Sequence, residues 1–387
     1  MPFVPPDPRE IRMLRPSYPD PDRVLGCLLG GAIGDALGAP VEGVPLAEIR
    51  RRYGPDGITG YVPGRLPAGS ITDDTQLTMF TVQALVQASV RARARGIGGA
   101  TPGLLQSAYL TWLGGQGVRM PPQHSAFGPL TMDPAMTSRR APGRTVLSAL
   151  LKAAERQRPG WPLGTVDEPI NDSKGCMGVV RAAPCGIAAG SAERAFELGR
   201  QAAALTHGHP DGQLPAGVLA ATVHGLLSGA GLRESLDAAR ALLREQRRHR
   251  ETSRALDRAV EMAAEPPTPE RLETLGGGWT GEEALAIGVY AALAAEREGA
   301  PEAVGRRGLL LAVNHSGDSD STGAVCGNLL GARYGTAAFP SAWRDGLEVR
   351  GTVAAMADDC VQEFGPNPPT GDYGEPPLSW LMRYPEA

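Results

Sequence analysis

The chain has 387 residues, of which 42% are hydrophobic and 21% are charged, the composition of a globular protein with one large or two ordinary domains. The formal net charge is only −4, which argues against a general nucleic-acid-binding surface. The five cysteines are odd in number and widely spaced, so we expect buried free thiols and not a disulfide framework.

Residues 1–21 are rich in proline and show little periodicity, which predicts an extended arm. No secretory signal is evident there, and no stretch of the sequence approaches the roughly 20 uninterrupted apolar residues of a membrane span. We therefore expect a cytoplasmic protein without a membrane partner.

The first predicted helix begins at Asp22 or Arg23 and carries a glycine at every fourth position. Glycine inside a helix costs roughly 0.5–1 kcal/mol relative to alanine, so a stripe of this kind predicts close backbone packing against another element. The same spacing returns near the C-terminus, and we expect both helices at the centre of the fold. The stripes are Gly26, Gly30, Gly34 and Gly38, and then Gly323, Gly327 and Gly331.

Two acidic residues, Asp35 and Glu42, follow the first stripe toward the C-terminal end of its helix. A carboxylate at that end opposes the helix dipole, which indicates a functional role. A short helix is predicted for residues 45–53, and a glycine-rich loop follows it.

The stretch Ser70–Phe80 then places a hydroxyl and two carboxylates at the start of an apolar helix that we expect to end near Arg93. These polar residues are Thr72, Asp73 and Asp74. Taken alone, they are also what helix capping and the helix dipole favour.

The middle of the chain contains three polar segments that could border a site. Residues 114–128 form a long glycine-rich loop, and a helix is predicted to open near Thr145. Ser173, Lys174 and Gly175 precede an apolar run, where free backbone N–H groups could hold phosphate; an ordinary capped turn is the alternative. His207 and His209 do not share a helical face, so we expect one histidine at a ligand, or a surface turn, and not a metal pair.

A second carboxylate cluster lies between a glycine turn and the second glycine stripe. An Asp-Ser-Asp alternation in extended backbone points Asp318 and Asp320 to one side and leaves Ser321 or Thr322 to cap the next helix. Asp73 and Asp74 could then close the shell from the opposite side.

Period-two alternation of β-branched residues is almost absent, so the predicted fold is all-α, a single compact multi-helix domain without a repeat. Further helices are predicted over residues 215–264, from Thr280 to about Ala295 and near 347–363. We divide the chain into the arm 1–21, the domain 22–363 and a proline-rich tail 364–387, whose Trp380 and Tyr384 are expected to pack back on the body.

Both carboxylate clusters lack a Cys ligand pair and a His-x-x-x-His spacing. Oxygen-only ligands favour hard cations such as Mg²⁺, Mn²⁺ or Ca²⁺ over Zn²⁺. The sequence therefore predicts a metal centre built from two distant segments.

Six motifs in order resemble the ADP-ribosylglycohydrolase family, and are similar to those of dinitrogenase reductase-activating glycohydrolases and ADP-ribosylarginine hydrolase-like proteins. The resemblance covers about residues 22–335 and implies an all-α fold with a central binuclear Mg²⁺ or Mn²⁺ site that binds ADP-ribose. The motifs are GxxxGxxxGDALGxxxE at 26–42, TDDT at 72–75, SKGCxGxxRxAP at 173–184, THGHP at 206–210, GWxGEEA at 278–284 and GDSDS at 317–321.

The resemblance also implies roles for individual residues. The metal ligands would be Thr72, Asp73, Asp74, Asp318, Asp320 and Ser321, the last where many relatives have Thr. Glu42 matches a glutamate near the substrate entrance, Ser173–Gly175 match a phosphate-holding loop, and His207 matches a ligand-contacting histidine. We add Asp35 as a substrate contact. Lys174 and Cys176 depart from the commoner residues of that loop, which leaves the finer substrate preference open.

The implied reaction is hydrolysis of the C1″ glycosidic bond of an ADP-ribose conjugate. Its transition state has oxocarbenium character, and two cations could hold the ribose hydroxyls beside an activated water. We assign Asp73, Asp74 or Asp318 to that water without choosing among them, and place Glu42 with the catalytic residues.

Two other classes stay open. One is a non-catalytic ADP-ribose binder or structural relative, and the other is a metal-dependent phosphohydrolase of ADP-ribose-like nucleotides. We expect a monomer; the acceptor could be arginine, serine, a nucleic acid or a small molecule.

Overall fold

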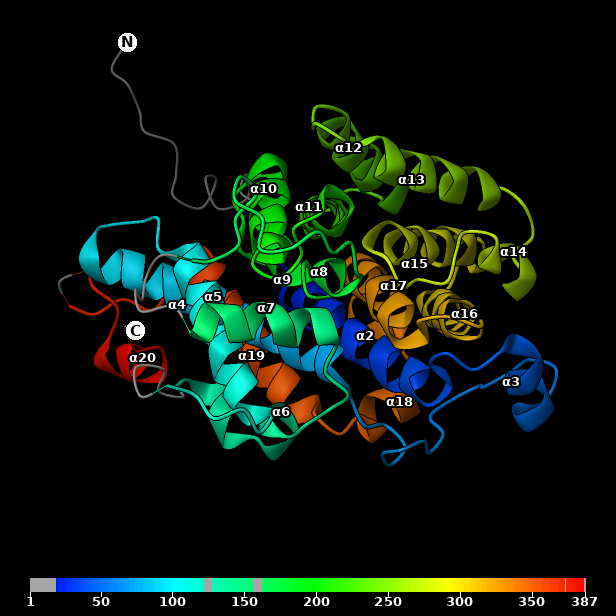
Figure 1. The fold of residues 1–387 in the computed structure, drawn as a ribbon, viewed down its shortest axis with the longest axis horizontal. Coiled ribbons are helices and arrows are strands. Elements are labelled where there is room, and N and C mark those ends of the chain that lie inside the picture. The colour runs from blue at the N-terminus through cyan, green and yellow to red at the C-terminus, as the bar shows by residue number, and fades with distance from the viewer. Residues whose placement is uncertain (1–18, 122–126, 156–161, 373, 386–387) are drawn as a thin grey trace, which may run out of the picture.

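In the computed structural model, the residues described are 19–121, 127–155, 162–372 and 374–385. They form helices joined by loops, with no strand and a single isolated bridge between Gly175 and Thr280 within these ranges (Figure 1). The α-helices are α2 (Pro21–Gly38), α3 (Leu46–Tyr53), α4 (Asp73–Arg95), α5 (Thr101–Gly115), α6 (Pro134–Thr137), α7 (Arg144–Ala154), α8 (Met177–Val180), α9 (Ala183–Ala188), α10 (Ala192–Ala204), α11 (Pro210–Leu227), α12 (Leu232–Arg244), α13 (Arg250–Met262), α14 (Pro269–Glu273), α15 (Gly281–Ala295), α16 (Pro301–Val313), α17 (Ser319–Tyr334), α18 (Ser341–Gly346), α19 (Arg350–Phe364) and α20 (Leu378–Arg383).

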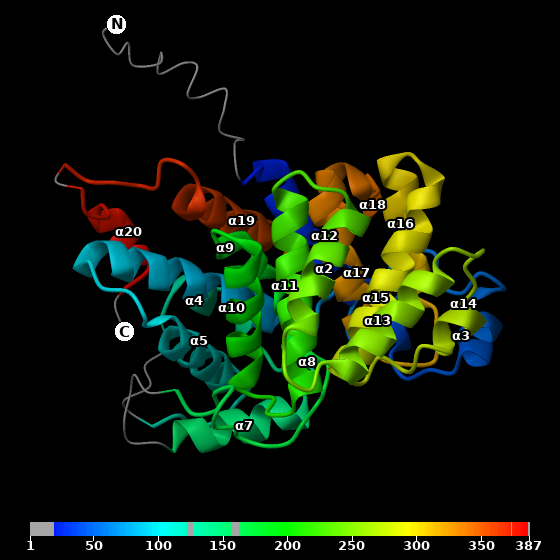
Figure 2. The same cartoon turned by 90° about the horizontal axis from the view of Figure 1, so that it is seen from above.

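Helices α2 and α17 lie side by side at the centre of the molecule, where both views place them among the other helices (Figures 1 and 2). Their glycine stripes face each other backbone to backbone, as predicted. A Cβ added at Gly26 would meet the carbonyl of Gly331, and one added at Gly30 would meet the carbonyl of Gly327. The order of these pairs makes the two helices antiparallel, so the end of α2 lies beside the start of α17.

Helix α2 is long and apolar enough to cross a membrane by length and composition, but 83% of its most apolar window is buried inside the protein. Its neighbours α17 and α19 supply that cover. Burial on this scale is typical of the core helix of a folded domain.

The remaining helices surround this pair and share one continuous hydrophobic core. Helices α4 and α5 pack together, as do α10 with α11 and α11 with α12, and Figure 2 shows α4 and α5 on the opposite side of the central pair from α16. The predicted all-α, single-domain fold is therefore confirmed.

Several predicted helix boundaries agree with the structure to within a few residues, including the start of α2, both ends of α15 and most of α19. Trp380 and Tyr384 are buried, with Trp380 donating to Glu363 at 2.9 Å and Tyr384 donating to Asp359. The predicted contact of the tail with the body is thus confirmed, whereas most of the predicted arm, 1–18, lies outside the described residues.

The extended backbone predicted for Asp318–Asp320 is wrong. Helix α17 begins at Ser319, so Asp318 is its N-cap residue and Asp320 lies in its first turn. The amide of Thr322 donates to the carbonyl of Asp318 at 3.1 Å, which closes the first helical turn, while the Asp318 amide is held by Gly277 at 2.7 Å. Helical geometry still brings both carboxylates toward the same cavity.

Candidate active site

A cavity of about 270 Å³ opens where the C-terminal end of α2 meets the N-terminal ends of α4 and α17. Its wall combines five acidic side chains with a glycine turn, a histidine, a thiol and a tryptophan. The lining residues are Glu42, Asp73, Asp74, Ala141, Gly143, Arg144, Thr145, Val146, Gly175, Cys176, Met177, His207, Trp279, Asp318, Asp320 and Ser321. The structure thus joins the two carboxylate clusters that the sequence keeps about 240 residues apart.

Asp73 and Asp74 occupy the first turn of α4. The Thr72 side chain caps this helix by accepting a hydrogen bond from the Asp74 amide at 3.2 Å. The amide of Gly143 donates to the Asp73 carboxylate at 3.3 Å, which ties the turn before α7 to the cluster. Thr72 is not among the cavity-lining residues, so its role as a metal ligand stays a prediction.

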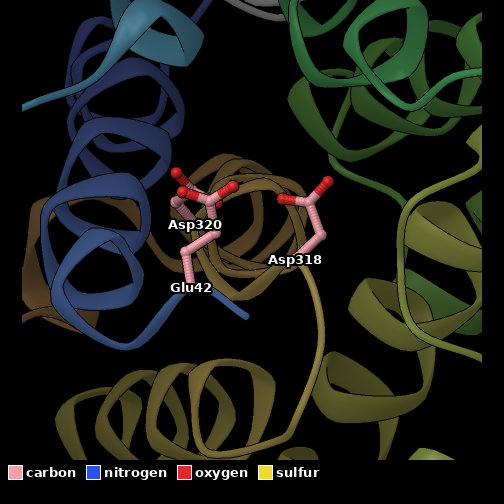
Figure 3. Close-up of side chains that lie close together, drawn as sticks. All are labelled: Glu42, Asp318 and Asp320. Carbon is pink, nitrogen blue, oxygen red and sulfur yellow. The ribbon is translucent and has the colours of Figure 1, made fainter. Parts of the chain in front are cut away.

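Glu42, Asp318 and Asp320 form the tightest acidic group (Figure 3). One oxygen from each lies within 4.8 Å of the others, a spacing that suits a shared cation. Glu42 follows α2, and the adjacent Gly43 amide donates to the Gly317 carbonyl at 2.8 Å, so backbone contact fixes it beside the start of α17. The family resemblance places Glu42 near the substrate entrance and with the catalytic residues, and this geometry adds it to the candidate ligands.

Burial dominates the electrostatics of the cavity. It raises the pKa of Asp73, Asp74 and Asp320 well above the ordinary value, and neighbouring carboxylates raise these pKa values further. The pKa of Glu42 is also raised, first by burial and then by Asp318. Within the described ranges, no ion pair joins the cavity aspartates to a lysine or arginine.

This donor set fits divalent cations. Closely spaced buried carboxylates without basic partners are costly unless protons or metal ions neutralise them. The Ser321 hydroxyl donates to Asp74 at 3.0 Å, which adds a further oxygen at the same place. The Cys176 thiol donates to Asp318 at 2.9 Å, and burial raises the thiol pKa, so this sulfur is kept protonated beside the oxygen ligands.

The loop Ser173–Gly175 reaches the cavity through Gly175, whereas the Lys174 side chain points elsewhere, so the substrate contact of Lys174 stays a prediction. Its ammonium is bound to Glu251 at 2.6 Å and to Glu282 at 2.8 Å, and Lys174 is absent from the cavity lining. The two carboxylates attract the side chain away from the cavity. Ser173 is also absent from the lining, and its hydroxyl accepts from the Gly175 amide at 3.3 Å, which shapes the turn.

His207 lines the cavity although only 1% of its surface is exposed. Its Nε2 faces Gly175, since a Cβ added there would lie 3.2 Å from this nitrogen. Burial, with a smaller effect of Arg181, lowers the pKa of His207 to about 3. The imidazole is therefore neutral at neutral pH.

Asp35 is not among the cavity-lining residues, so its role as a substrate contact stays a prediction. It is fully buried, and its carboxylate accepts from the Thr72 amide at 3.0 Å and from the Thr75 amide at 3.1 Å. The Thr75 hydroxyl donates to it as well. Through these hydrogen bonds Asp35 positions the start of α4, and with it Asp73 and Asp74.

Sequence reasoning missed two parts of the wall. The segment Ala141–Val146 approaches Asp73 through Gly143, and Ala141 adopts a positive φ of 56° that alanine rarely occupies. Trp279 is 49% exposed at the edge of the cavity although large aromatic residues are usually more buried. The GWxGEEA motif that contains it is the signal in the sequence that could have found it. The loop 114–128, expected to border the site, does not contribute to the lining among its described residues.

Fold and cavity together define a helical protein with a buried, carboxylate-rich site suited to divalent cations. Comparison with known proteins identifies the family: the ADP-ribosylglycohydrolase model matches residues 16–369, so the chain belongs to the ADP-ribosylglycohydrolase family. The family resemblance seen in the motifs is thereby confirmed.

Individual relatives span most of the chain. ADP-ribosyl-[dinitrogen reductase] glycohydrolase of Rhodospirillum rubrum is 26% identical over 338 residues, covering 85% of this chain and 91% of its own length. ADP-ribosylarginine hydrolase Tri1 of Pseudomonas putida (strain GB-1) is 26% identical over 343 residues, covering 83% and 73%. A solved structure titled ADP-ribosylglycohydrolase-related protein complex superposes with a TM-score of 0.61 at 29% identity, covering 89% of this chain and 98% of its own.

Proposed function

We propose that this protein is a divalent-cation-dependent hydrolase that removes ADP-ribose from modified proteins by cleaving the C1″ glycosidic bond. The observation that carries the proposal is that four buried aspartates, Asp73, Asp74, Asp318 and Asp320, meet the exposed Glu42 in one cavity. Family membership supplies the reaction class.

Two Mg²⁺ or Mn²⁺ ions are the proposed cofactors. Glu42, Asp318 and Asp320 would hold one ion, and Asp73, Asp74 and Ser321 supply further oxygen donors in the same cavity. Such ions would orient the ribose hydroxyls and lower the pKa of a bound water.

The protein's own groups then complete the reaction. A carboxylate among Asp73, Asp74 and Asp318 orients the water and accepts its proton as the water attacks C1″. The glycosidic bond breaks with its electron pair leaving on the acceptor, the carboxylic acid formed in this way returns its proton to the acceptor, and ADP-ribose is released. Acidic side chains stabilise the positive charge that develops on the sugar ring.

The substrate would extend from the carboxylates in two directions. His207 offers a hydrogen-bond donor for the diphosphate, and the missing side chain of Gly175 leaves room beside it. Glu42 and the exposed Trp279 border the side where the acceptor would leave. Because relatives are named for dinitrogen reductase and for ADP-ribosylarginine, protein-linked ADP-ribose is the first substrate class to test.

The test is a panel of ADP-ribosylated arginine, serine, nucleic-acid and small-molecule conjugates, with free ADP-ribose scored as product. We expect release that requires Mg²⁺ or Mn²⁺ and stops in excess chelator. Full turnover by metal-stripped protein, or restoration by Zn²⁺ alone, would contradict the proposal. Formation of AMP would indicate a phosphohydrolase instead, and tight ADP-ribose binding without any turnover would indicate a binding protein.

A further inference from the structure

Arg181 is a fully buried cation that the reaction described above does not use. It lies directly after α8, and in the part of the chain that the structure describes it pairs with no carboxylate. Its guanidinium lies 4.3 Å from the centre of the Tyr109 ring, while its Nε and Nη1 have no hydrogen-bond partner. Burying an unpaired charge is expensive, which indicates that this arginine performs a specific task.

Among the described residues, the side chain that accepts a hydrogen bond from Arg181 leads directly to the cavity. Its Nη2 donates to the Ala202 carbonyl at 2.9 Å and to the Thr206 hydroxyl oxygen at 2.6 Å. The Thr206 hydroxyl is in turn 2.8 Å from Nδ1 of His207. The opposite nitrogen of that imidazole, Nε2, faces Gly175 at the cavity wall.

The number of donors in the hydrogen-bond series Arg181–Thr206–His207 determines where each proton lies. A guanidinium has no acceptor, so the Thr206 oxygen must accept from Arg181. The Thr206 hydroxyl then has one proton, and His207 Nδ1 is the acceptor that the structure provides for it. If Nδ1 carried a proton instead, the hydroxyl would be a buried donor without a partner, at a cost of about 1–3 kcal/mol.

We propose that Arg181 is a positioning residue that acts through Thr206 to hold His207 in the tautomer with its proton on Nε2, directed at an oxygen of the ligand's diphosphate. The identity of the ligand rests on the proposed function, whereas the tautomer rests on the hydrogen bonds alone. A neutral imidazole in this form is a pure donor toward the cavity, which suits phosphate oxygens that only accept.

The first experiment reads the tautomer directly. Two-dimensional ¹H–¹⁵N spectra of the ¹⁵N-histidine-labelled full chain, with His207→Ala to assign the signal, report which ring nitrogen is protonated. We expect Nε2 to be protonated and Nδ1 to show the shift of a nitrogen that accepts a hydrogen bond. A proton on Nδ1 in the unmodified protein would overturn the proposal.

Two variants of the relay separate positioning from packing. Thr206→Val keeps the volume but removes the hydroxyl, and Thr206→Ser keeps the hydroxyl. We expect Thr206→Val to lose the hydrogen-bond shift at Nδ1 and to weaken ADP-ribose binding in calorimetry about fivefold, the value of roughly one hydrogen bond, with Thr206→Ser close to the original protein. Arg181→Gln should reproduce the Thr206→Val effect if it folds.

The outcomes distinguish the two proposals. Equal ADP-ribose affinity of Thr206→Val and Thr206→Ser, with Nδ1 changed only in the former, would refute the role of the tautomer in binding. A protein that shows the expected tautomer but binds no ADP-ribose would refute the proposed function and leave the relay established.

Discussion

Alanine at Gly38 and alanine at Gly26 should damage the same helix contact and yet affect the site differently. Both glycines belong to the α2 stripe, but they lie at opposite ends of it. A Cβ at Gly38 would lie 2.3 Å from the amide nitrogen of Asp320, whereas a Cβ at Gly26 would lie 2.5 Å from the carbonyl carbon of Gly335, far from the carboxylates.

The size of the effect follows from these distances. Ordinary contact begins at 3.4 Å, so the helices must separate by about 1.1 Å at Gly38 and about 0.9 Å at Gly26. Overpacking of this kind costs roughly 1–3 kcal/mol. At about 2.1 cal/mol/K per residue, this lowers the melting temperature by roughly 1–4 °C in either variant.

Only the Gly38 variant should also lose the site. Mg²⁺ requires oxygens within a narrow range near 2.1 Å, so a shift of about 1 Å between Glu42 and Asp320 is larger than the coordination tolerates. Misplacement by this distance can reduce turnover about 100-fold. Gly26→Ala should keep metal affinity and turnover within a few-fold of the original protein.

Calorimetric melting without metal, Mn²⁺ titration and ADP-ribose release are the three measurements. Gly351→Ala is the matched control, because an added Cβ there meets nothing within 4 Å on a helix, and alanine should stabilise α19 by roughly 0.5–1 kcal/mol. Equal losses of metal affinity at Gly38 and Gly26 would refute the reasoning about the site. A Gly38 variant as stable as the control would refute backbone contact itself.

Three further predictions concern charge. Asp320→Asn should sharply lower metal affinity and turnover. The metal-free variant should melt at the same temperature or slightly higher, because a buried acid beside other carboxylates is removed. A fully active variant would show that Asp320 is not a metal ligand. Because the pKa values of Asp73, Asp74 and Asp320 are raised, the folded metal-free protein binds more protons than the unfolded chain. Its stability should therefore fall as pH rises from the unfolded pKa of about 3.9 through the raised pKa values, and the stabilisation by Mn²⁺ should grow over the same range. Calorimetric melting that shows a pH-independent Mn²⁺ effect would contradict this. Lys174→Ala should lower the free energy of unfolding by about 1 kcal/mol, because the partly exposed ammonium is bound to Glu251 and Glu282. ADP-ribose affinity in calorimetry should stay unchanged. A large loss of affinity would show that Lys174 contacts the ligand.

The sequence predicted those features whose cause is local or repeated. Glycine at every fourth position has one main physical explanation in a buried helix, and the pairing of Gly30 with Gly327 confirms it. The sequence also predicted that Asp73 and Asp74 would lie opposite Asp318 and Asp320. All four carboxylates line one cavity, although the extended backbone expected for Asp318–Asp320 is helical.

The sequence could not predict the side-chain directions, because these depend on partners distant in sequence. Lys174 lies in the expected loop, but Glu251 and Glu282 determine where its ammonium points. Asp35 is not in the cavity lining, and its carboxylate accepts hydrogen bonds from the backbone amides of Thr72 and Thr75. Trp279 was missed because exposure cannot be deduced from residue type alone.

The glycine stripes and the carboxylates belong to one physical arrangement. Antiparallel packing places the end of α2 beside the start of α17, and only glycine lets the two backbones approach closely enough for Glu42 to lie beside Asp318 and Asp320. Each glycine lowers helix stability by roughly 0.5–1 kcal/mol, and the buried acids raise the cost further until cations or protons neutralise them. A cation that binds the folded chain alone would return part of this free energy. Stability and activity should therefore depend on the same metal ions, because the contact that weakens the central helices is the contact that assembles the site.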